Sequence, residues 1–241
     1  MDLTEADDIT VSIWRGAADG AFRDYHVVAR ANETVLDLVT QVQRRLDPTL
    51  AYRFACRVGM CGSCAMTVSG KPRWTCRTLV SDVARGGRLR LAPLENLPVI
   101  RDLVADMSAF FDKWQRARGR FRPTDAEGDF ALIKPESEAR RRVDAAIECI
   151  NCGVCYAACE VVGRLPDYLG PAALNRAWSL QNDERDGGFD DRLAAVAGAG
   201  GCLDCHTGQR CTAFCPKTLN PTRAIAGLKR MTATALLKGR L

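Results

Sequence analysis

Hydrophobic and polar residues alternate along the first third of the chain in the way typical of β-strands. Apolar residues occupy every second position over 9–13, and after a glycine-bearing turn a second strand is expected over 22–29. From Asn32, the expected helix N-cap, apolar residues recur at helical spacing as far as Leu46. Further strands are expected at 65–69, 74–79 and 88–91. A hairpin, a helix and additional strands predict a small β-grasp domain.

The rest of the chain has mainly helical periodicity. An apolar face over 99–114 is interpreted as one helix, and a proline-containing linker follows at 133–136. Later helices are expected at 137–147, 171–181, 190–196 and 221–237, two of which begin at a proline, the residue favoured in a first helical turn. We therefore predict an α+β protein with a β-grasp domain at 1–105 and an all-α domain at 106–241.

The composition is that of a soluble globular protein of two domains, with 241 residues, 47% hydrophobic and 26% charged. The chain contains no run of eighteen apolar residues, and its acidic start at 1–8 resembles neither a secretory signal nor a transit peptide. We expect a cytoplasmic, reducing location. Twelve cysteines in such a location favour metal binding over disulfides.

The formal net charge of +5 does not by itself indicate a nucleic-acid partner. Each thiolate-ligated iron–sulfur cluster carries about −2, so three clusters would bring the loaded protein to about −1. The strongest basic run lies at 116–123. It is compatible with a solvated loop and with a docking patch for an acidic partner subunit.

The first cysteine group follows the C-x4-C-x2-C…C spacing of plant-type ferredoxins, which hold a [2Fe–2S] cluster. Its members are Cys56, Cys61, Cys64 and Cys76. Gly59 and Gly62 suit a loop that wraps a cluster, because glycine permits unusual backbone angles and close approach of amides to sulfur. Zinc sites favour two short C-x2-C pairs instead.

Two further cysteine runs, at 149–159 and 205–215, are expected to share ligands between two clusters. In C-x2-C-x2-C-x3-C runs of bacterial ferredoxins the fourth cysteine serves a second cluster. The second run of this chain repeats the spacing, but Gly208 replaces its middle cysteine. Crossing the runs predicts a [4Fe–4S] cluster on Cys149, Cys152, Cys155 and Cys215, and a [3Fe–4S] cluster on Cys159, Cys205 and Cys211. Cys202 is left over, either as a buried free thiol or as a fourth ligand that converts the three-iron site into [4Fe–4S].

The sequence lacks an evident catalytic pair. Neither His26 nor His206 has a nucleophile or carboxylate partner that the pattern identifies, and the thiolates are assigned to iron. Three redox centres without a catalytic site predict an electron conduit, in which the protein sets the order and potentials of its cofactors.

The chain resembles the iron–sulfur subunit of succinate dehydrogenase and fumarate reductase over nearly its whole length. The resemblance is carried by the motifs at 56–64, 101–107, 149–159, 170–173 and 215–225. It implies a [2Fe–2S] domain that docks on an FAD-containing flavoprotein subunit. The helical domain would lie against membrane anchor subunits, with or without haem b, and exchange electrons with quinone. The chain would then serve respiration and the tricarboxylic acid cycle as a subunit without a complete active site, held peripherally at the cytoplasmic face of the bacterial inner membrane.

The resemblance also implies two residues near the quinone, His206 and Lys229, which match family positions. The chain departs from the family at Glu160, where the family usually has proline, and at Gly163 and Arg164, where many members have tryptophan. A carboxylate beside an anionic cluster should lower the potential of the cluster, so Glu160→Gln is expected to raise that potential. In the alternative interpretation, Glu160 faces solvent.

The motifs favour neither succinate oxidation nor fumarate reduction. A related dehydrogenase subunit with a thiol acceptor in place of quinone is a second hypothesis. A structural zinc module for protein interaction is a third, from a different class, although Cys215-Pro216 after interlocked runs has no purpose in such a module.

Overall fold

A computed structural model describes residues 7–124 and 134–241. Residue 133 of the expected linker and residues 1–6 of the acidic start lie outside these ranges. The chain divides into two compact units, Met1–Met107 with Ile150–Ala158, and Ser108–Cys149 with Cys159–Leu241. The boundary predicted from the sequence, between 105 and 106, lies close to the first of these divisions.

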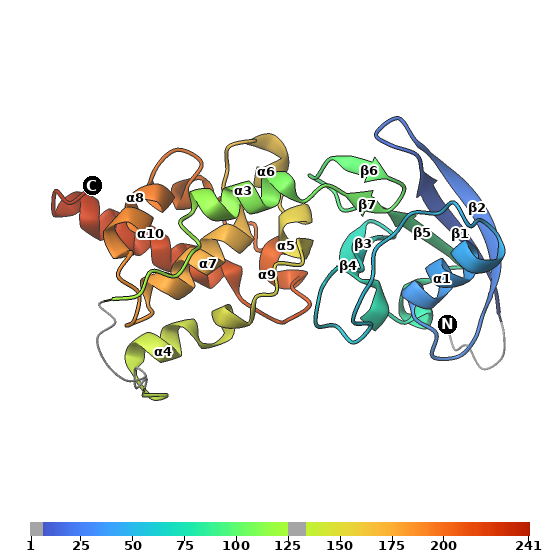
Figure 1. Ribbon diagram of the computed structural model, residues 1–241, viewed down its shortest axis with the longest axis horizontal. Coiled ribbons are helices and arrows are strands. Elements are labelled where there is room, and N and C mark those ends of the chain that lie inside the picture. Colours follow the sequence, from blue (N-terminus) through green and yellow to red (C-terminus); the bar gives the residue numbers. More distant parts are fainter. Residues whose placement is uncertain (1–6, 125–133) are drawn as a thin grey trace. The chain divides into compact units, whose positions relative to one another are not determined.

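The first unit is built on a five-stranded mixed sheet in the order β2-β1-β5-β3-β4 (Figure 1). β1 pairs antiparallel with β2 and parallel with the central strand β5, and β3 pairs antiparallel with both β5 and β4. The bounds are Asp7–Arg15 for β1, Ala21–Ala29 for β2, Ala65–Val68 for β3, Lys71–Trp74 for β4 and Arg88–Ala92 for β5. The predicted α+β class and β-grasp domain are confirmed.

Helix α1 (Val35–Arg45) buries its apolar face in the same core as the alternating residues of β1 and β5. Its N-cap is Thr34 and not Asn32, which has a positive φ of 65° two residues earlier. Thr34 forms a capping box with Asp37, in which each side chain bonds the other residue's backbone N–H. The sequence placed the helix correctly and its cap two residues too early.

The strand expected at 74–79 is wrong. The chain leaves the sheet after Trp74 and forms a 3₁₀ turn, η1 (Thr75–Arg77), followed by the short helix α2 (Val80–Val83). The hydroxyls of Thr75 and Thr78 donate to the nearby carbonyls of Cys64 and Trp74, at 2.9 and 2.6 Å. The Thr75–Cys64 bond spans eleven residues, and the backbone N–H of Val35 donates to the Thr78 carbonyl at 2.9 Å, so tertiary contacts decide the path of this segment.

The single helix expected over 99–114 is also wrong. Its first part is a small hairpin, β6 (Val99–Arg101) and β7 (Val104–Ala105), and only α3 (Ser108–Arg116) is helical. Asp102 turns the hairpin with a φ of 52° and is 1% exposed. Its carboxylate accepts from the backbone N–H groups of Gly16 and Ala51, both at 2.8 Å, and so the turn is fixed by tertiary contacts.

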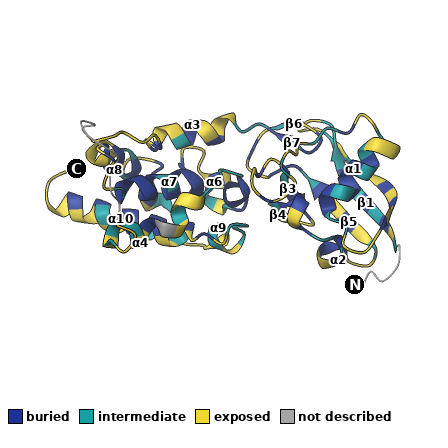
Figure 2. Ribbon diagram, turned by 60° about the horizontal axis from the view of Figure 1, so that its bottom comes forward, coloured by how far each residue is buried: buried dark blue, intermediate teal, exposed yellow. Residues whose placement is uncertain are grey.

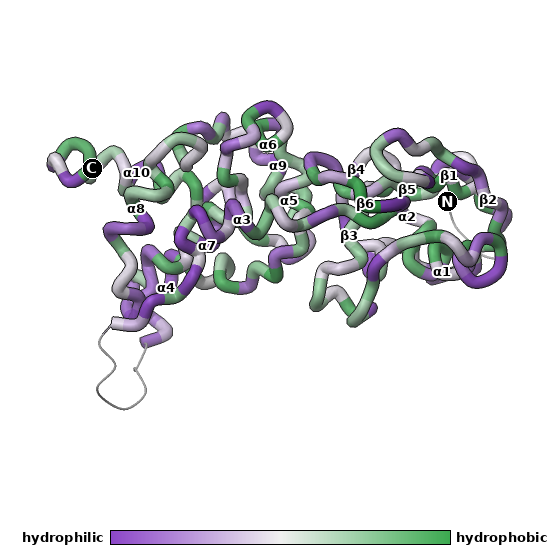
Figure 3. Tube along the Cα trace, turned by 45° about the horizontal axis from the view of Figure 1, so that its top comes forward, coloured by the Kyte–Doolittle hydropathy of each residue, from purple (hydrophilic) through white to green (hydrophobic). Residues whose placement is uncertain are grey.

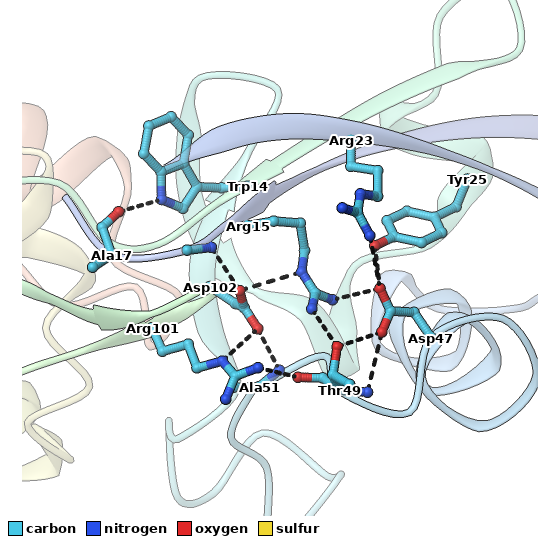
Figure 4. Close-up of polar contacts among 11 residues, drawn as sticks. Trp14, Arg15, Ala17, Arg23, Tyr25, Asp47, Thr49, Ala51, Arg101 and Asp102 are labelled. Carbon is cyan, nitrogen blue, oxygen red and sulfur yellow. Dashed lines mark hydrogen bonds and ion pairs between the residues drawn. The ribbon is translucent and has the colours of Figure 1, made fainter. Parts of the chain in front are cut away.

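Asp102 belongs to an ionic cluster in this unit (Figure 4). Arg15 lies 3.2 Å from carboxylate oxygens of both Asp102 and Asp47. Asp47 also accepts hydrogen bonds from the hydroxyls of Tyr25, at 2.7 Å, and Thr49, at 2.5 Å. The bonds from Thr49 and Tyr25 lower the pKa of Asp47 to about 2.

The second unit is helical. Its longest helices are α7 (Pro171–Gln181) and α10 (Pro221–Leu237), whose predicted bounds are confirmed, and α8 (Phe189–Ala197) is one residue longer than predicted at each end. The helix expected at 137–147 is α4 (Glu138–Val143) followed by the 3₁₀ segment η2 (Asp144–Glu148). The remaining elements are short: α6 (Glu160–Arg164), η3 (Cys202–Asp204) and α9 (Arg210–Ala213). Another, α5 (Val154–Ala157), belongs to the first unit.

Buried residues concentrate on α7 and on one face of α10 (Figure 2). Gly227 lets the ring of Trp178 pack directly on α10, because a Cβ there would overlap the ring. Among the described helices none is both long enough and apolar enough to cross a lipid bilayer.

The basic run at 116–123 has a fixed backbone. Arg192, fully buried, donates to the carbonyls of Arg118 and Arg120 and lies 2.8 Å from buried Asp186. Asp186 in turn accepts from the backbone N–H of Arg122 at 3.1 Å. The run is therefore an anchored surface segment, with the side chains of Arg118 and Arg120 exposed.

Candidate metal centres

The four cysteines of the first motif lie together in the first unit. Cys56, Cys61 and Cys64 belong to the loop before β3, and Cys76 lies in η1. The Cys56 sulfur accepts from the backbone N–H groups of Met60 and Cys61, both at 3.2 Å. Thr75, which precedes Cys76, donates through its hydroxyl to the Cys64 carbonyl at 2.9 Å, and so η1 lies beside the cysteine loop.

The acidities of these thiols differ widely. Hydrogen bonding from Ser63, whose hydroxyl lies 3.0 Å from the Cys61 sulfur, lowers the pKa of Cys61 to about 6. Burial, followed by the neighbouring Cys64, raises the pKa of Cys76 to about 11. Metal binding requires thiolates, and a thiolate forms more readily at Cys61 than at Cys76.

Two glycines allow the loop to wrap tightly. Gly59 and Gly62 have φ of 75° and 71°. A Cβ on Gly59 would lie 3.1 Å from side-chain carbons of Trp74 and Arg77, and one on Gly62 would overlap Cys152 of the same unit. Both positions therefore require glycine for conformation and for space.

In the second unit, Cys159, Cys205 and Cys211 line one cavity of about 100 Å³. Cys159 is the N-cap of α6, Cys205 follows η3, and Cys211 lies in α9. The structure thus brings together three thiols that the sequence places in two different runs. A small cavity walled by three sulfurs fits a three-ligand iron–sulfur cluster, the group assigned to it from the sequence.

Hydrogen-bond donors surround these sulfurs. The backbone N–H groups of Val161 and Val162 favour the Cys159 thiolate, although burial raises the pKa of this thiol overall. Cys205 accepts from the N–H of Thr207 at 3.4 Å, and Cys211 lies 3.5 Å from the Thr222 hydroxyl. Such donors stabilise anionic sulfur and thereby tune the potential of a bound cluster.

The mouth of this cavity carries charged and polar groups. Glu160 and Arg210 form an ion pair at 2.9 Å, which joins the residue after Cys159 to the residue before Cys211. His206 lines the cavity, whereas Lys229 does not and instead donates to the Cys205 carbonyl at 2.6 Å. Of the two residues matched to the family's quinone region, only His206 borders this space.

Cys202 lies in η3, where it contacts α10. Its side chain is fully buried, and its sulfur is 3.6 Å from the hydroxyl of Thr232 on α10. It is absent from the residues that line the cavity. This placement supports the interpretation of Cys202 as a buried free thiol. It does not support the alternative in which Cys202 is a fourth ligand.

The four residues assigned to [4Fe–4S] are described within their own units. Cys152 and Cys155 belong to the first, where Asn96 donates to the carbonyls of Tyr156 and Ala157 at 3.4 and 3.0 Å and anchors α5. Cys149 and Cys215 belong to the second, where their neighbours Glu148 and Lys217 form an ion pair at 3.1 Å. The grouping of all four remains a prediction from spacing.

Within the described ranges, no three His, Cys, Asp or Glu side chains are placed to hold a single metal ion. In a cubane cluster each cysteine binds a different iron, and in [2Fe–2S] each iron takes two, so no three of these ligands would converge on one ion.

Sequence reasoning missed three residues of these centres. Ser63 contacts Cys61, Arg210 pairs with Glu160, and Tyr168, 1% exposed, lines the cavity of the second unit. Burial and then the nearby Cys205 and Cys159 raise the pKa of Tyr168. Ser63 lies inside the motif and could have been singled out from its position, whereas no sequence signal identifies the other two.

Comparison with known proteins matches both parts of the chain. Residues 10–112 match the family described as 2Fe-2S iron-sulfur cluster binding domain, and residues 145–219 match the 4Fe-4S dicluster domain. The chain therefore has binding domains for [2Fe–2S] and [4Fe–4S] clusters.

Similar proteins agree on the wider family. The fumarate reductase iron-sulfur subunit of Mycobacterium tuberculosis is 37% identical over 95% of this chain and 93% of its own length. The mitochondrial succinate dehydrogenase [ubiquinone] iron-sulfur subunit of Dictyostelium discoideum is 35% identical over 83% of this chain and 72% of its own. A chain of the Mycobacterium smegmatis Sdh1 complex superimposes with a TM-score of 0.86 at 30% identity, covering 95% of this chain and 97% of that one. The chain belongs to the family of iron–sulfur subunits of fumarate reductase and succinate dehydrogenase.

Proposed function

We propose that this chain passes electrons between FAD in a flavoprotein subunit and quinone at a membrane anchor, through [2Fe–2S], [4Fe–4S] and [3Fe–4S] clusters. As a member of its family it is the electron-transfer subunit of an oxidoreductase complex and does not carry a complete active site. The observation that carries the proposal is the convergence of Cys159, Cys205 and Cys211 on one cavity, in addition to the four-cysteine loop of the first unit.

The clusters supply one-electron chemistry when bound, and the residues of the chain hold and tune them. Cys56, Cys61, Cys64 and Cys76 would hold [2Fe–2S], and Gly59 and Gly62 let amide groups reach their sulfurs. Cys149, Cys152, Cys155 and Cys215 would hold [4Fe–4S]. The three thiols of the second unit's cavity would hold [3Fe–4S].

Quinone would contact the chain at the mouth of the same cavity. His206 borders this space and could donate a hydrogen bond to a quinone oxygen. Lys229 would act indirectly, because its ammonium group holds the Cys205 carbonyl and so fixes the loop that carries His206. Peripheral attachment at the cytoplasmic face of the membrane, through anchor subunits with or without haem b, completes the proposal.

Gentle purification of the native complex tests these statements together. We expect a flavoprotein and at least one anchor subunit to copurify with the chain. The complex should contain flavin and about nine irons per chain. Succinate oxidation is assayed with quinone, and fumarate reduction with quinol. Low-temperature paramagnetic resonance of the oxidised complex should show a three-iron signal. Its absence in a fully iron-loaded preparation would contradict the [3Fe–4S] assignment, and a complex active only with a thiol acceptor would contradict the quinone assignment.

A further inference from the structure

A second cavity in the helical unit lies apart from the cysteines. It is a groove of about 430 Å³, within the size range of small-molecule sites, and residues of α4, α7, α8 and α10 line it. Its lining contains no acidic side chain and five basic ones: Arg142, Arg223, Arg230, Lys238 and Arg240. We refer to it as the cationic groove.

Three of these cations have no counter-ion among the residues that the structure describes. Arg142 pairs with Glu138, and Arg240 lies 2.9 Å from Asp190, but both carboxylates are largely exposed. Exposed pairs of this kind contribute little and exchange readily. Over the ranges that the structure describes, the side chains of Arg223, Arg230 and Lys238 make no ion pair or hydrogen bond, and all three are exposed. Within the described part of the chain, the groove therefore presents positive charge that no carboxylate of its lining offsets.

The remaining walls of the groove are partly apolar and rigid. They include Trp178, Phe189, Leu193 and Met231. The indole N–H of Trp178 donates to the Arg142 carbonyl at 3.2 Å, and its ring packs on Gly227. An anion in this groove would meet fixed apolar surface as well as charge.

The end of α10 beside the groove exposes large apolar side chains. Leu237 is 90% exposed, Leu236 is 51% exposed and Leu241 is 41% exposed. They lie on both sides of Lys238 and Arg240 in the sequence, and Figure 3 shows hydrophobic and hydrophilic residues close together at this terminus. A free phosphate or sugar phosphate would need only the charges, whereas a ligand with a charged head and an apolar tail would use both features.

We propose that the cationic groove binds the phosphate head of an acidic phospholipid at a bilayer surface, with Leu236, Leu237 and Leu241 entering the apolar boundary. This contact is made by the chain itself and adds to any attachment through partner subunits. Basic side chains at an anionic membrane surface each strengthen binding, and the exposed leucines supply the apolar contribution that charge alone lacks.

Cosedimentation of the full chain with vesicles tests the proposal. We expect binding to vesicles of equal parts phosphatidylcholine and phosphatidylglycerol, and little binding to phosphatidylcholine alone. The triple variant Arg223→Gln/Arg230→Gln/Lys238→Gln should bind the acidic vesicles on the order of a hundredfold more weakly. A second variant, Leu236→Ser/Leu237→Ser, should also weaken binding although it keeps every charge.

A matched control separates the groove from net charge. Arg30, Arg44 and Arg45 are exposed cations of the β-grasp unit, and their triple substitution by Gln removes the same charge. This control should bind within about twofold of the unaltered chain, because its changes lie outside the proposed site. Circular dichroism melting of each variant establishes that it is folded.

Several results would overturn the proposal. Equal loss in the control triple variant would reduce the effect to net charge. Unchanged binding in the leucine variant, with release from vesicles by millimolar glycerol phosphate, would make the groove a site for small soluble anions. Equal binding to both kinds of vesicle, or none to either by a folded chain, would exclude acidic-lipid recognition.

Discussion

The ion pair between Glu160 and Arg210 sets the charge at the mouth of the three-cysteine cavity. Each residue directly adjoins a proposed ligand, Cys159 or Cys211. A lone carboxylate there would disfavour reduction of an anionic cluster, but Arg210, 2.9 Å away, offsets most of its charge. The potential should therefore depend on both residues.

Single substitutions should shift this potential in opposite directions. Glu160→Gln leaves Arg210 uncompensated and should raise the midpoint potential of the [3Fe–4S] cluster, and Arg210→Gln should lower it, each by tens of millivolts. The double variant should return close to the unaltered value. Redox titration followed by paramagnetic resonance measures all three. If both single variants had the midpoint potential of the unaltered protein, the ion pair would not act on the cluster.

Asp47 provides a test of stability at the same scale. Its pKa in the folded protein is about 2, chiefly because Thr49 and Tyr25 donate to its carboxylate. This lies below the usual value near 3.9, and so its stabilisation is complete above pH 4 and is lost as pH falls toward 2. Asp47→Asn should lower the free energy of unfolding by about 2 kcal/mol at pH 7.

Denaturant melts of both proteins across the pH range check this expectation. The difference in unfolding free energy should shrink from about pH 4 downward and nearly vanish near pH 2. Asp19→Asn, at an exposed turn position, serves as the control and should change little. A deficit in Asp47→Asn that is constant with pH would mean that packing, not charge, is responsible.

At the scale of elements, the turn before α9 determines how many ligands the second cavity offers. Gly208 lines this cavity, and a Cβ built on it meets no atom within 4 Å. The position occupies the place of the missing middle cysteine in its run. A thiol at 208 therefore has room to become a fourth ligand.

Gly208→Cys should convert the three-iron cluster into [4Fe–4S]. The oxidised variant should lose its three-iron paramagnetic signal and gain about one iron per chain. Gly208→Ser is the matched control, which adds a side chain of similar size without a thiol and should keep the three-iron signal. Retention of that signal in fully loaded Gly208→Cys would place position 208 away from the open corner of the cluster.

The packing of α7 on α10 is set by one small residue. Gly227→Ala would overlap the ring of Trp178, so the helices must separate or the ring must move. We expect a loss of about 1–3 kcal/mol in the free energy of unfolding, seen as a lower melting temperature. Gly198→Ala in the same unit has only ordinary contacts at 3.7 Å and should be nearly neutral.

The elements predicted correctly are those whose local signals agree with their packing. Helices α7 and α10 begin at Pro171 and Pro221 and carry apolar faces, so their bounds follow from the sequence. The errors at 74–79 and 99–114 arise where tertiary contacts decide. The carboxylate of Asp102 turns a hairpin inside an apolar pattern of helical period, and its partners lie far away in sequence.

The candidate centres follow the same rule. Ligand spacing identifies the thiols because the clusters require that chemistry in that order. The groups that tune the thiols, such as Tyr168 and Arg210, come from positions without a motif, and only the fold brings them to the cavity.

For the whole molecule, the two units offer separate cluster sites. All four proposed [2Fe–2S] ligands lie in the first unit, and all three proposed [3Fe–4S] ligands lie in the second. Each unit buries at least one of its own ligands: Cys76 in the first unit and Cys211 in the second. Loss of one of these clusters should therefore leave the other in place.

Two serine substitutions test this independence. Cys76→Ser should remove the [2Fe–2S] signal and about two of nine irons, and Cys211→Ser should remove the three-iron signal and about three. Each variant should retain the signal of the other centre, because no ligand is shared between the two. Iron analysis and paramagnetic resonance on the same samples decide the outcome. If either substitution abolished both signals in a chain that is still folded by circular dichroism, the two sites would have to assemble as one unit, and the assignment of ligands to separate parts of the chain would be wrong.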